Sequence, residues 1–155
     1  MDKPTEIEIC EVKVFVSKAA SDVPLPSYQS EGASGMDLHA YISEPIVIRP
    51  GEIKLIPTGI RIALPRGYEA QVRPRSGLAL KHGLTIVNAP GTIDSDYRGE
   101  IKVILINLGR KDFTIESGMR IAQLVVAPVV HARLQVTDTL PETCRGEGGF
   151  GHSGI

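Results

Sequence analysis

The sequence has almost no net charge and few cysteines, and these shortages exclude several kinds of protein. Its 155 residues include 17 Lys and Arg against 18 Asp and Glu, a formal net charge of −1. We therefore expect no direct nucleic-acid partner held by bulk positive charge, and an anionic ligand would need a local site. Cys10 and Cys144 lack the C-x-x-C or Cys/His spacing of a zinc site, which fits free thiols in a reducing compartment.

Long apolar runs and long helical periodicity are also missing. The longest apolar stretch, Ile121 to Val130, is interrupted by Gln123 and Pro128, so no membrane span and no membrane partner are predicted. The first residues lack the basic-then-apolar pattern of a signal peptide. The length suits one domain with its own core, so we expect a single cytoplasmic domain.

The sequence instead contains many short runs rich in Val and Ile, separated by turn signals such as Arg49-Pro-Gly51 and Pro65-Arg-Gly67. This spacing is typical of antiparallel sandwiches and barrels. In the first run the apolar phase shifts, which predicts a bulge near Cys10 and Glu11. The predicted strands are Ile7 to Val16, Ile46 to Ile48, Ile53 to Ile56, Ile60 to Leu64, Glu69 to Arg73, Ile101 to Leu108, Phe113 to Ile115 and Ile121 to Ala127.

One segment, Pro74 to Gly83, reads as a short helix with Ser76 as a possible N-cap and Gly83 beyond its end. Free amide groups at its start, beside Arg75, would attract an anion. A capped helix that joins two strands and holds no ligand is the plainer alternative. Both interpretations fit the residues.

Carboxylates gather in the segment Ile93 to Gly99, which we expect at a β-hairpin, with Asp94 and Asp96 on one face. Such a pair can divide a general-base role from a supporting one, or hold magnesium-bound water. A solvated acidic turn is the alternative. Gln123, a lone amide among apolar residues, either bonds backbone at a strand end or points at a ligand.

The C-terminal tail, Arg145 to Ile155, combines five glycines with one guanidinium and one aromatic ring. Glycine loses the most backbone entropy on ordering, so this tail should stay mobile until a ligand compensates. Arg145 suits phosphate oxygens, and Phe150 offers a stacking face for a base. A frayed terminus without function is the alternative.

Together these segments resemble the five ordered motifs of the trimeric deoxyuridine triphosphatase family, across nearly the whole chain. The motifs read Ala33-Ser-Gly-Met-Asp-Leu-His-Ala40, Pro74-Arg-Ser-Gly-Leu-Ala79, Asn88-Ala-Pro-Gly-Thr-Ile-Asp-Ser-Asp-Tyr-Arg-Gly-Glu100, Arg120-Ile-Ala-Gln-Leu124 and Arg145-Gly-Glu-Gly-Gly-Phe-Gly-His-Ser-Gly154. The resemblance implies an all-β, jelly-roll-like barrel with one short helix. Residues 1–142 would form the barrel domain and residues 143–155 its glycine-rich lid.

The resemblance also implies an activity: Mg²⁺-dependent hydrolysis of dUTP to dUMP and pyrophosphate, in a homotrimer whose active sites are shared between subunits. This reaction limits uracil incorporation into DNA and supplies dUMP for dTMP synthesis. Asp94 would activate the attacking water. Asp37 would act either on magnesium through water or as an anchor for the phosphate site.

The substrate contacts implied by the resemblance fall along the whole nucleotide. The uracil edge would meet Asn88 and the backbone of Thr92 and Ile93, while Tyr97 packs under the deoxyribose. The phosphates would meet Arg75, Ser76, Gly77 and Gln123, Arg145 would reach the γ-phosphate, Phe150 would cover the base, and Lys102 is a further substrate-facing candidate.

Two other functions compete with this one. A dCTP deaminase of related fold would need an acid or base beside C4 of the base, and Ile93 to Gly99 offers none free of the phosphate role. A non-catalytic nucleotide sensor or capsid-like module would keep the fold without the chemistry. Assays for pyrophosphate and ammonia with dUTP and dCTP separate the three.

Overall fold

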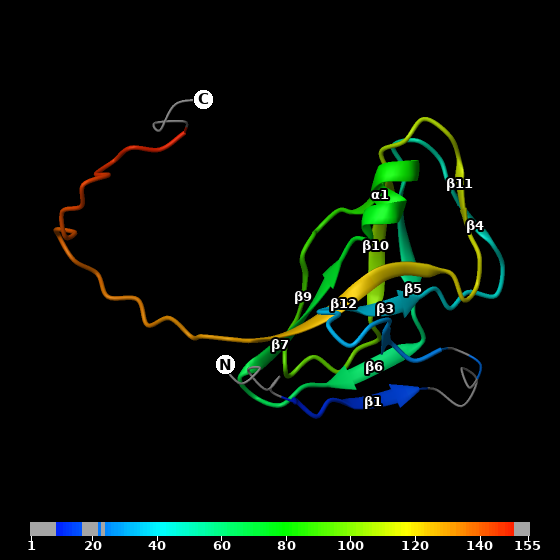
Figure 1. Ribbon diagram of the computed structural model, residues 1–155, viewed down its shortest axis with the longest axis horizontal. Helices are drawn as coiled ribbons and strands as arrows, with labels where there is room; N and C mark the ends of the chain where they lie inside the picture. Colours follow the sequence, from blue (N-terminus) through cyan, green and yellow to red (C-terminus); the bar gives the residue numbers. More distant parts are fainter. Residues whose placement is uncertain (1–8, 17–21, 23, 151–155) are drawn as a thin grey trace, which may run out of the picture.

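Strands dominate the chain, as the sequence pattern predicts. The computed structural model describes residues 9–16, 22 and 24–150, and within them only one element is a helix (Figure 1). In chain order the elements are β1 (Lys13–Val16), β2 (Ser27–Tyr28), β3 (Met36–His39), β4 (Ile46–Ile48), β5 (Ile53–Pro57), β6 (Ile60–Ala63), β7 (Tyr68–Arg73), α1 (Ser76–His82), β8 (Leu84–Ile86), β9 (Gly91–Ile93), β10 (Lys102–Asn107), β11 (Phe113–Ile115) and β12 (Arg120–Pro128).

The strands pair antiparallel in four sheets. The largest has the order β2-β3-β12-β7-β9, a second has the order β5-β10-β8, and β1-β6 and β11-β4 form two-stranded ribbons. The all-β, jelly-roll-like class is thereby confirmed, although the sheets do not close into a barrel. An antiparallel arrangement of this kind brings residues far apart in sequence onto neighbouring strands.

The core is one apolar cluster to which strands of all four sheets contribute. Burial alternates along β10, where Val103, Leu105 and Asn107 are buried while the residues between them are not. Leu38 of β3 and Leu124 of β12 belong to the same apolar cluster. Each such side chain contributes about 1.5–3 kcal/mol when it leaves water, so this cluster is the main source of stability.

Most predicted strands match the observed ones. The runs for β4 and β11 agree residue for residue. Those for β5, β6 and β7 differ by one residue at one end, and those for β10 and β12 by one residue at each end. In the first run only residues 13–16 form a strand, while residues 9–12 do not, so the bulge predicted near Cys10 is wrong because there is no ladder to interrupt. Residues 7 and 8 lie outside the described part.

Helix α1 begins one residue earlier than a Ser76 N-cap would allow. Arg75 occupies the N-cap position with extended angles (φ −93°, ψ 127°) and makes no side-chain cap, so the capping role predicted for Ser76 is wrong. Gly83 ends the helix in the left-handed region at φ 67°, as predicted. Across the described residues, no helix has the length and apolarity that a membrane crossing requires.

Candidate active site

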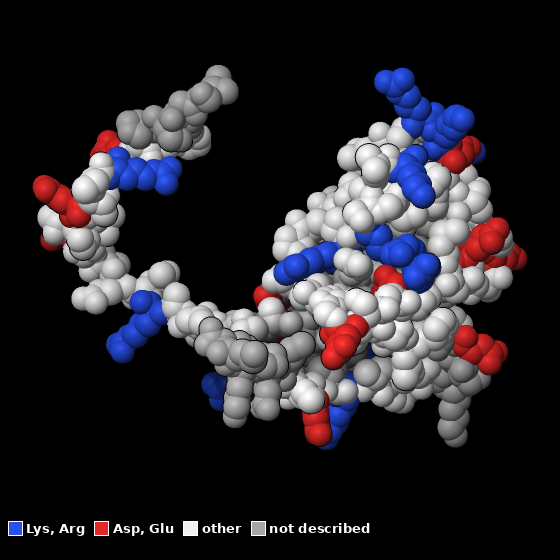
Figure 2. All heavy atoms as spheres, viewed as in Figure 1, with Lys and Arg blue, Asp and Glu red and all other residues white. Residues whose placement is uncertain are grey.

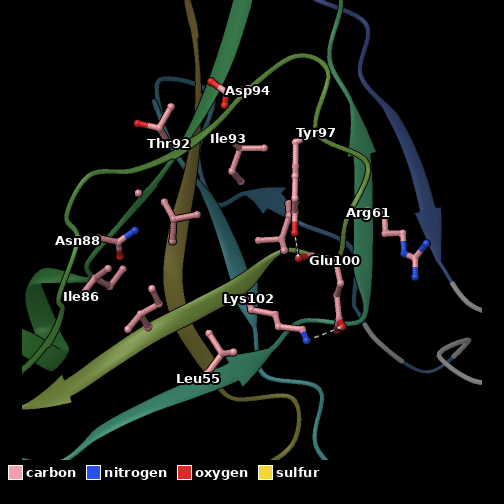
Figure 3. A pocket seen from close by; sticks show the side chains of 14 residues that line it. Leu55, Arg61, Ile86, Asn88, Thr92, Ile93, Asp94, Tyr97, Glu100 and Lys102 are labelled. Carbon is pink, nitrogen blue, oxygen red and sulfur yellow. Dashed lines mark hydrogen bonds and ion pairs between the residues drawn. The ribbon is translucent and has the colours of Figure 1, made fainter.

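A cavity of about 510 Å³ lies beside β9 and the start of β10 (Figure 3). Its wall includes both apolar side chains, such as Val72 and Ile86, and convergent polar groups, which is the usual make-up of a small-molecule site. The predicted site residues that line it are Asn88, Thr92, Ile93, Asp94, Tyr97 and Lys102.

The segment that builds this cavity crosses between the two larger sheets. β8 pairs with β10, whereas β9 pairs with β7, so the strands on either side of residues 94–101 belong to different sheets. The hairpin predicted here is therefore wrong, because β9 and β10 pair with strands of different sheets and not with each other. The crossing leaves a hollow lined by the segment.

Asp94 and Asp96 lie in a turn, which the Tyr97 N–H closes by donating to the Asp94 carbonyl oxygen at 3.1 Å. Strand alternation does not apply there, and the shared strand face predicted for the two carboxylates is wrong. Asp94 lines the cavity beside β9 as well as a second hollow that also contains Asp96. Of the two carboxylates, only Asp94 lines the cavity beside β9.

Tyr97, Glu100 and Lys102 form one connected group at the cavity wall (Figure 3). The Tyr97 hydroxyl donates to the Glu100 carbonyl oxygen at 3.0 Å. The Glu100 carboxylate accepts the Gly59 N–H at 2.9 Å and lies 3.9 Å from the Lys102 ammonium. The Tyr97 ring is thus linked to the backbone of Glu100, and the Glu100 carboxylate to Gly59 and Lys102, along one wall.

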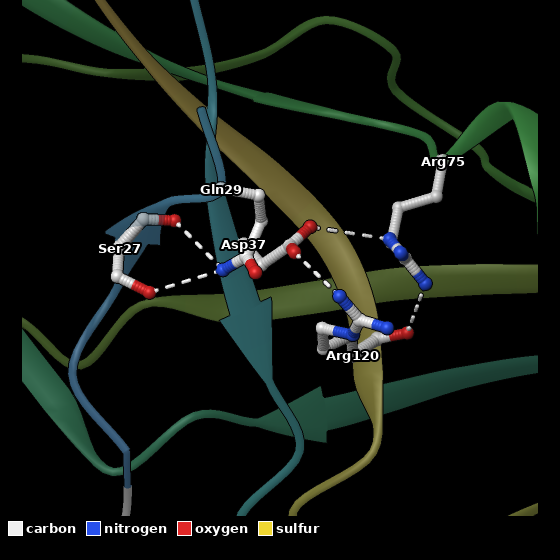
Figure 4. Close-up of polar contacts among 5 residues, drawn as sticks. All are labelled: Ser27, Gln29, Asp37, Arg75 and Arg120. Atoms are coloured by element: carbon white, nitrogen blue, oxygen red, sulfur yellow. Dashed lines mark hydrogen bonds and ion pairs between the residues drawn. The ribbon is translucent and has the colours of Figure 1, made fainter. Parts of the chain in front are cut away.

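A second group of charges surrounds Asp37 on β3 (Figure 4). Its carboxylate lies 3.2 Å from Arg75 Nε and 3.3 Å from Arg120 Nη1, and Arg75 also donates to the Arg120 carbonyl oxygen at 3.3 Å. Asp37 is 3% exposed, and it pairs in register with Gln123 of β12. The buried carboxylate holds Arg75 directly before Ser76 and Gly77.

His39 lies two residues beyond Asp37 and is also unusual. Its Nδ1 is buried without a hydrogen-bond partner among the described residues. Burial lowers the pKa of His39 from its ordinary 6.5, the Asp37 carboxylate opposes this, and Arg120 and Arg75 add to the lowering. The neutral imidazole is therefore the favoured form.

The C-terminal segment forms a third group, away from both. Beyond β12, residues 129–150 run as an arm away from the body (Figures 1 and 2). Phe150 is fully exposed, and Arg145 Nε donates to the nearby Gly148 carbonyl oxygen at 2.7 Å. Residues 151–155 of the predicted tail motif lie outside the described residues. Within one chain, the predicted site residues are thus divided among three places.

Two residues of this arrangement were not assigned a role from the sequence. Arg120 begins one of the motifs, but its contact with Asp37 joins residues 83 positions apart, and no local pattern signals it. Glu100 ends another motif, and its bond to Gly59 again depends on the fold. The only local sign of a role for Glu100 is its position two residues before Lys102, with which it forms an ion pair.

Comparison with known proteins decides the family. The family model described as dUTPase matches residues 21–154. The chain belongs to the dUTPase family. A deoxyuridine 5'-triphosphate nucleotidohydrolase of Thermoanaerobacter sp. (strain X514) is 58% identical over 144 residues, which cover 93% of this chain and 97% of that relative. The enzyme of the same name from Desulfotalea psychrophila is 63% identical over 131 residues, 84% of this chain and 87% of the relative.

Solved dUTPase structures share the fold. The Staphylococcus bacteriophage 80alpha dUTPase with dUPNHPP superposes with a TM-score of 0.83 at 25% identity, covering 94% of this chain and 99% of that one. Its G164S mutant with dUpNHpp gives a TM-score of 0.79 at 27% identity, with the same coverage. This dUTPase family member therefore matches its solved relatives over nearly their whole length.

Proposed function

We propose that this chain hydrolyses dUTP to dUMP and pyrophosphate, which limits uracil in DNA and supplies dUMP for dTMP synthesis. The observation that carries the proposal is the cavity in which Asn88, Asp94 and Tyr97 meet. Membership of the dUTPase family and the name shared by relatives at 58% identity and above support the same substrate. The cytoplasmic location indicated by the sequence stays a prediction.

Base and sugar would be selected inside this cavity. Asn88 and the backbone of Thr92 and Ile93 would hydrogen-bond the uracil edge, and a narrow pocket leaves no room for the thymine methyl group. The amino group of cytosine would place a hydrogen-bond donor against donors that pair with the uracil oxygen. Buried donors without an acceptor cost more binding free energy than a single methyl group changes. Tyr97 would pack under the deoxyribose and crowd a 2′-hydroxyl.

The chemical step would begin at Asp94. Its carboxylate takes a proton from a water molecule, whose oxygen forms a bond to the α-phosphorus while the bond from that phosphorus to the bridging oxygen breaks. Pyrophosphate leaves with the electron pair of that bond. The triphosphate would be held by Arg75, Ser76, Gly77 and Gln123, while Arg145 reaches the γ-phosphate and Phe150 covers the base. Lys102 is a further substrate-facing candidate.

Magnesium would enter with the triphosphate. Among the described residues there is no group of three or more His, Cys, Asp or Glu side chains that could hold a metal ion. Asp37 is engaged by Arg75 and Arg120, which favours the anchor role for it over contact with the metal shell. The residues fit an ion held mainly by phosphate oxygens, where it would neutralise charge on the leaving pyrophosphate.

We propose further that the active site is completed in a homotrimer. The cavity, the Asp37 group and the arm with Arg145 and Phe150 lie apart in one chain, so one nucleotide would need groups from different subunits. The outward face of β5 and β10 is apolar, with Ile53 and Leu55 each 54% exposed. An exposed apolar sheet face of this kind is typical of a subunit interface.

The arm itself supports a shared site. Between Val130 and Val136 apolar and polar residues alternate as in a half-buried strand, yet Val130, Leu134 and Val136 are all more than 90% exposed. These side chains would be covered by a neighbouring subunit, and residues 143–155 would then close as a lid over a cavity formed mainly by residues 1–142.

A substrate panel tests the proposed activity. We expect pyrophosphate from dUTP at a far higher kcat/KM than from dTTP, dCTP or UTP. Ammonia released from dCTP would select the deaminase, and binding of dUTP without turnover would select the sensor.

Subunit mixing tests the shared site. Asp94→Asn and a chain truncated after Glu142 are each expected to be inactive alone, and they are unfolded and refolded together. When equal amounts assemble at random, about three quarters of the trimers contain both variants, and each of these has one intact site of three. About a quarter of the wild-type number of sites should therefore return. No recovery, with mixed trimers confirmed by mass, would show that base and tail come from the same chain.

A further inference from the structure

The Tyr97 ring is not held in place by burial. It is 46% exposed at the cavity wall. A half-exposed side chain ordinarily exchanges between rotamers within nanoseconds. A ring that is to discriminate one hydroxyl group must instead keep its position within about 0.5 Å. Another contact must therefore fix the ring.

That contact is the hydrogen bond from the Tyr97 hydroxyl to the Glu100 carbonyl oxygen, at 3.0 Å (Figure 3). The chain folds back tightly to make it. A Cβ added at Gly99 would collide with the Tyr97 hydroxyl oxygen, so any larger residue would displace the ring. Position 99 requires glycine for this close approach, and the ring depends on where the backbone of Glu100 lies.

The backbone of Glu100 is itself fastened to the turn at residues 58–60. The Glu100 carboxylate accepts the Gly59 N–H at 2.9 Å, and the Thr58 hydroxyl donates to the Ile101 carbonyl oxygen at 2.6 Å. Gly59 has a φ of 73°, and a Cβ there would lie 2.9 Å from the Tyr41 ring, so the turn is closely fixed. The Ile101 N–H, in the same peptide unit as the Glu100 carbonyl, donates to the Ile60 carbonyl oxygen at 2.9 Å, so the Glu100 side chain ties the ring to this turn together with a backbone bond.

We propose that Glu100 is a positioning residue for sugar specificity: its carboxylate, by accepting the Gly59 N–H, holds the backbone that anchors the Tyr97 hydroxyl. This inference rests on the proposed function, in which Tyr97 crowds a 2′-hydroxyl. In this role Glu100 acts only as a hydrogen-bond acceptor. Its negative charge, which lies 3.9 Å from the Lys102 ammonium, takes no part in the sugar specificity. Loss of the acceptor should therefore weaken the choice of dUTP over UTP.

The test is the ratio of kcat/KM for dUTP to that for UTP. We expect Glu100→Ala to lower this ratio by up to about fivefold, the value of one typical hydrogen bond. Glu100→Gln keeps an acceptor for the Gly59 N–H and should restore the ratio, even if the loss of its charge beside Lys102 changes KM for both substrates. Tyr97→Phe should match Glu100→Ala, and the double variant should fall no further because both remove the same anchor.

Glu52→Ala is the matched control. Glu52 also accepts a backbone N–H, that of Arg49 at 2.9 Å, and it lies 4.0 Å from Lys54, but it does not line the cavity. Glu52→Ala therefore removes a hydrogen bond of the same kind away from the cavity, and it should leave the ratio of kcat/KM for dUTP to that for UTP unchanged.

Several results would overturn the inference. Equal losses on both substrates in Glu100→Ala would show a structural role only, and Gln behaving as Ala would show a role for charge. If Glu100→Ala does not fold, an unchanged ratio in Tyr97→Phe would overturn the inference, because the hydroxyl anchor would then not affect sugar choice. A wild-type protein without a preference for dUTP would instead refute the proposed function.

Discussion

Replacing Asp37 by Asn should loosen the predicted phosphate site and destabilise the fold together. Asp37 is 3% exposed and its two carboxylate oxygens each contact a guanidinium, Arg75 at 3.2 Å and Arg120 at 3.3 Å. Asn keeps the size of the side chain but removes the charge. Two neighbouring cations would then share a single neutral acceptor.

The magnitude follows from the exposure of the two partners. Side-chain exposure is 26% for Arg75 and 48% for Arg120. Arg120 donates a charge-assisted hydrogen bond to Asp37, but at 48% exposure solvent screening leaves it about 1 kcal/mol, while the better buried ion pair with Arg75 contributes about 2 kcal/mol. The amide oxygen recovers about 1 kcal/mol through one neutral bond. The expected loss of unfolding free energy is about 2 kcal/mol.

Urea denaturation of wild type and Asp37→Asn measures this loss, and double-mutant cycles with Arg75→Ala and Arg120→Ala divide it between the partners. The coupling energy should be larger with Arg75. KM for dUTP should rise as Arg75 loses its anchor. A loss below about 0.5 kcal/mol, or a larger coupling with Arg120, would refute the argument from burial.

Three further predictions concern the active site and pH. Asp94→Asn should lower kcat at least about a hundredfold while dUTP still binds, and Asp96→Asn should be milder; loss of binding with near-normal turnover would contradict this. Tyr97→Ala should relax the choice of dUTP over UTP more than it weakens phosphate binding, measured with inorganic pyrophosphate as competitor. Burial holds the pKa of His39 below 6.5, so the unfolded chain takes up the proton first and stability should fall as pH drops below 6.5. Between about pH 7.5 and about pH 5.5 the urea midpoint of His39→Gln should fall less than that of wild type.

Much of the fold could be predicted because the strands that cover the core have a strong local pattern. β10 and β12 are long and rich in Val and Ile, and they were located to within one residue. Four strands were missed, β3 and β8 as well as β2 and β9, and with two to four residues each they leave little alternation to detect. The clearest cases are β2 and β9. Their position depends on pairing with β3 and β7, which only the folded chain supplies.

The candidate site was predicted unevenly for a similar reason. Motif residues such as Asn88 and Asp94 lie close together in sequence and meet in one cavity. Asp37 and Arg120 are brought together by the register between β3 and β12, which the sequence does not state. Likewise Ser76 looks like a cap by residue type, but the extended backbone of Arg75 takes that position. Contacts across strands, rather than residue types, were the missing information.

The most direct test of the central claim is hydrolysis of dUTP in water enriched in oxygen-18. Attack by water at the α-phosphorus places one labelled oxygen in dUMP and none in pyrophosphate, because the new bond forms on the phosphorus that stays with the nucleoside. We predict this result for wild type and its loss, at equal time, in Asp94→Asn. Label in the pyrophosphate, or no pyrophosphate from dUTP at all, would contradict the account.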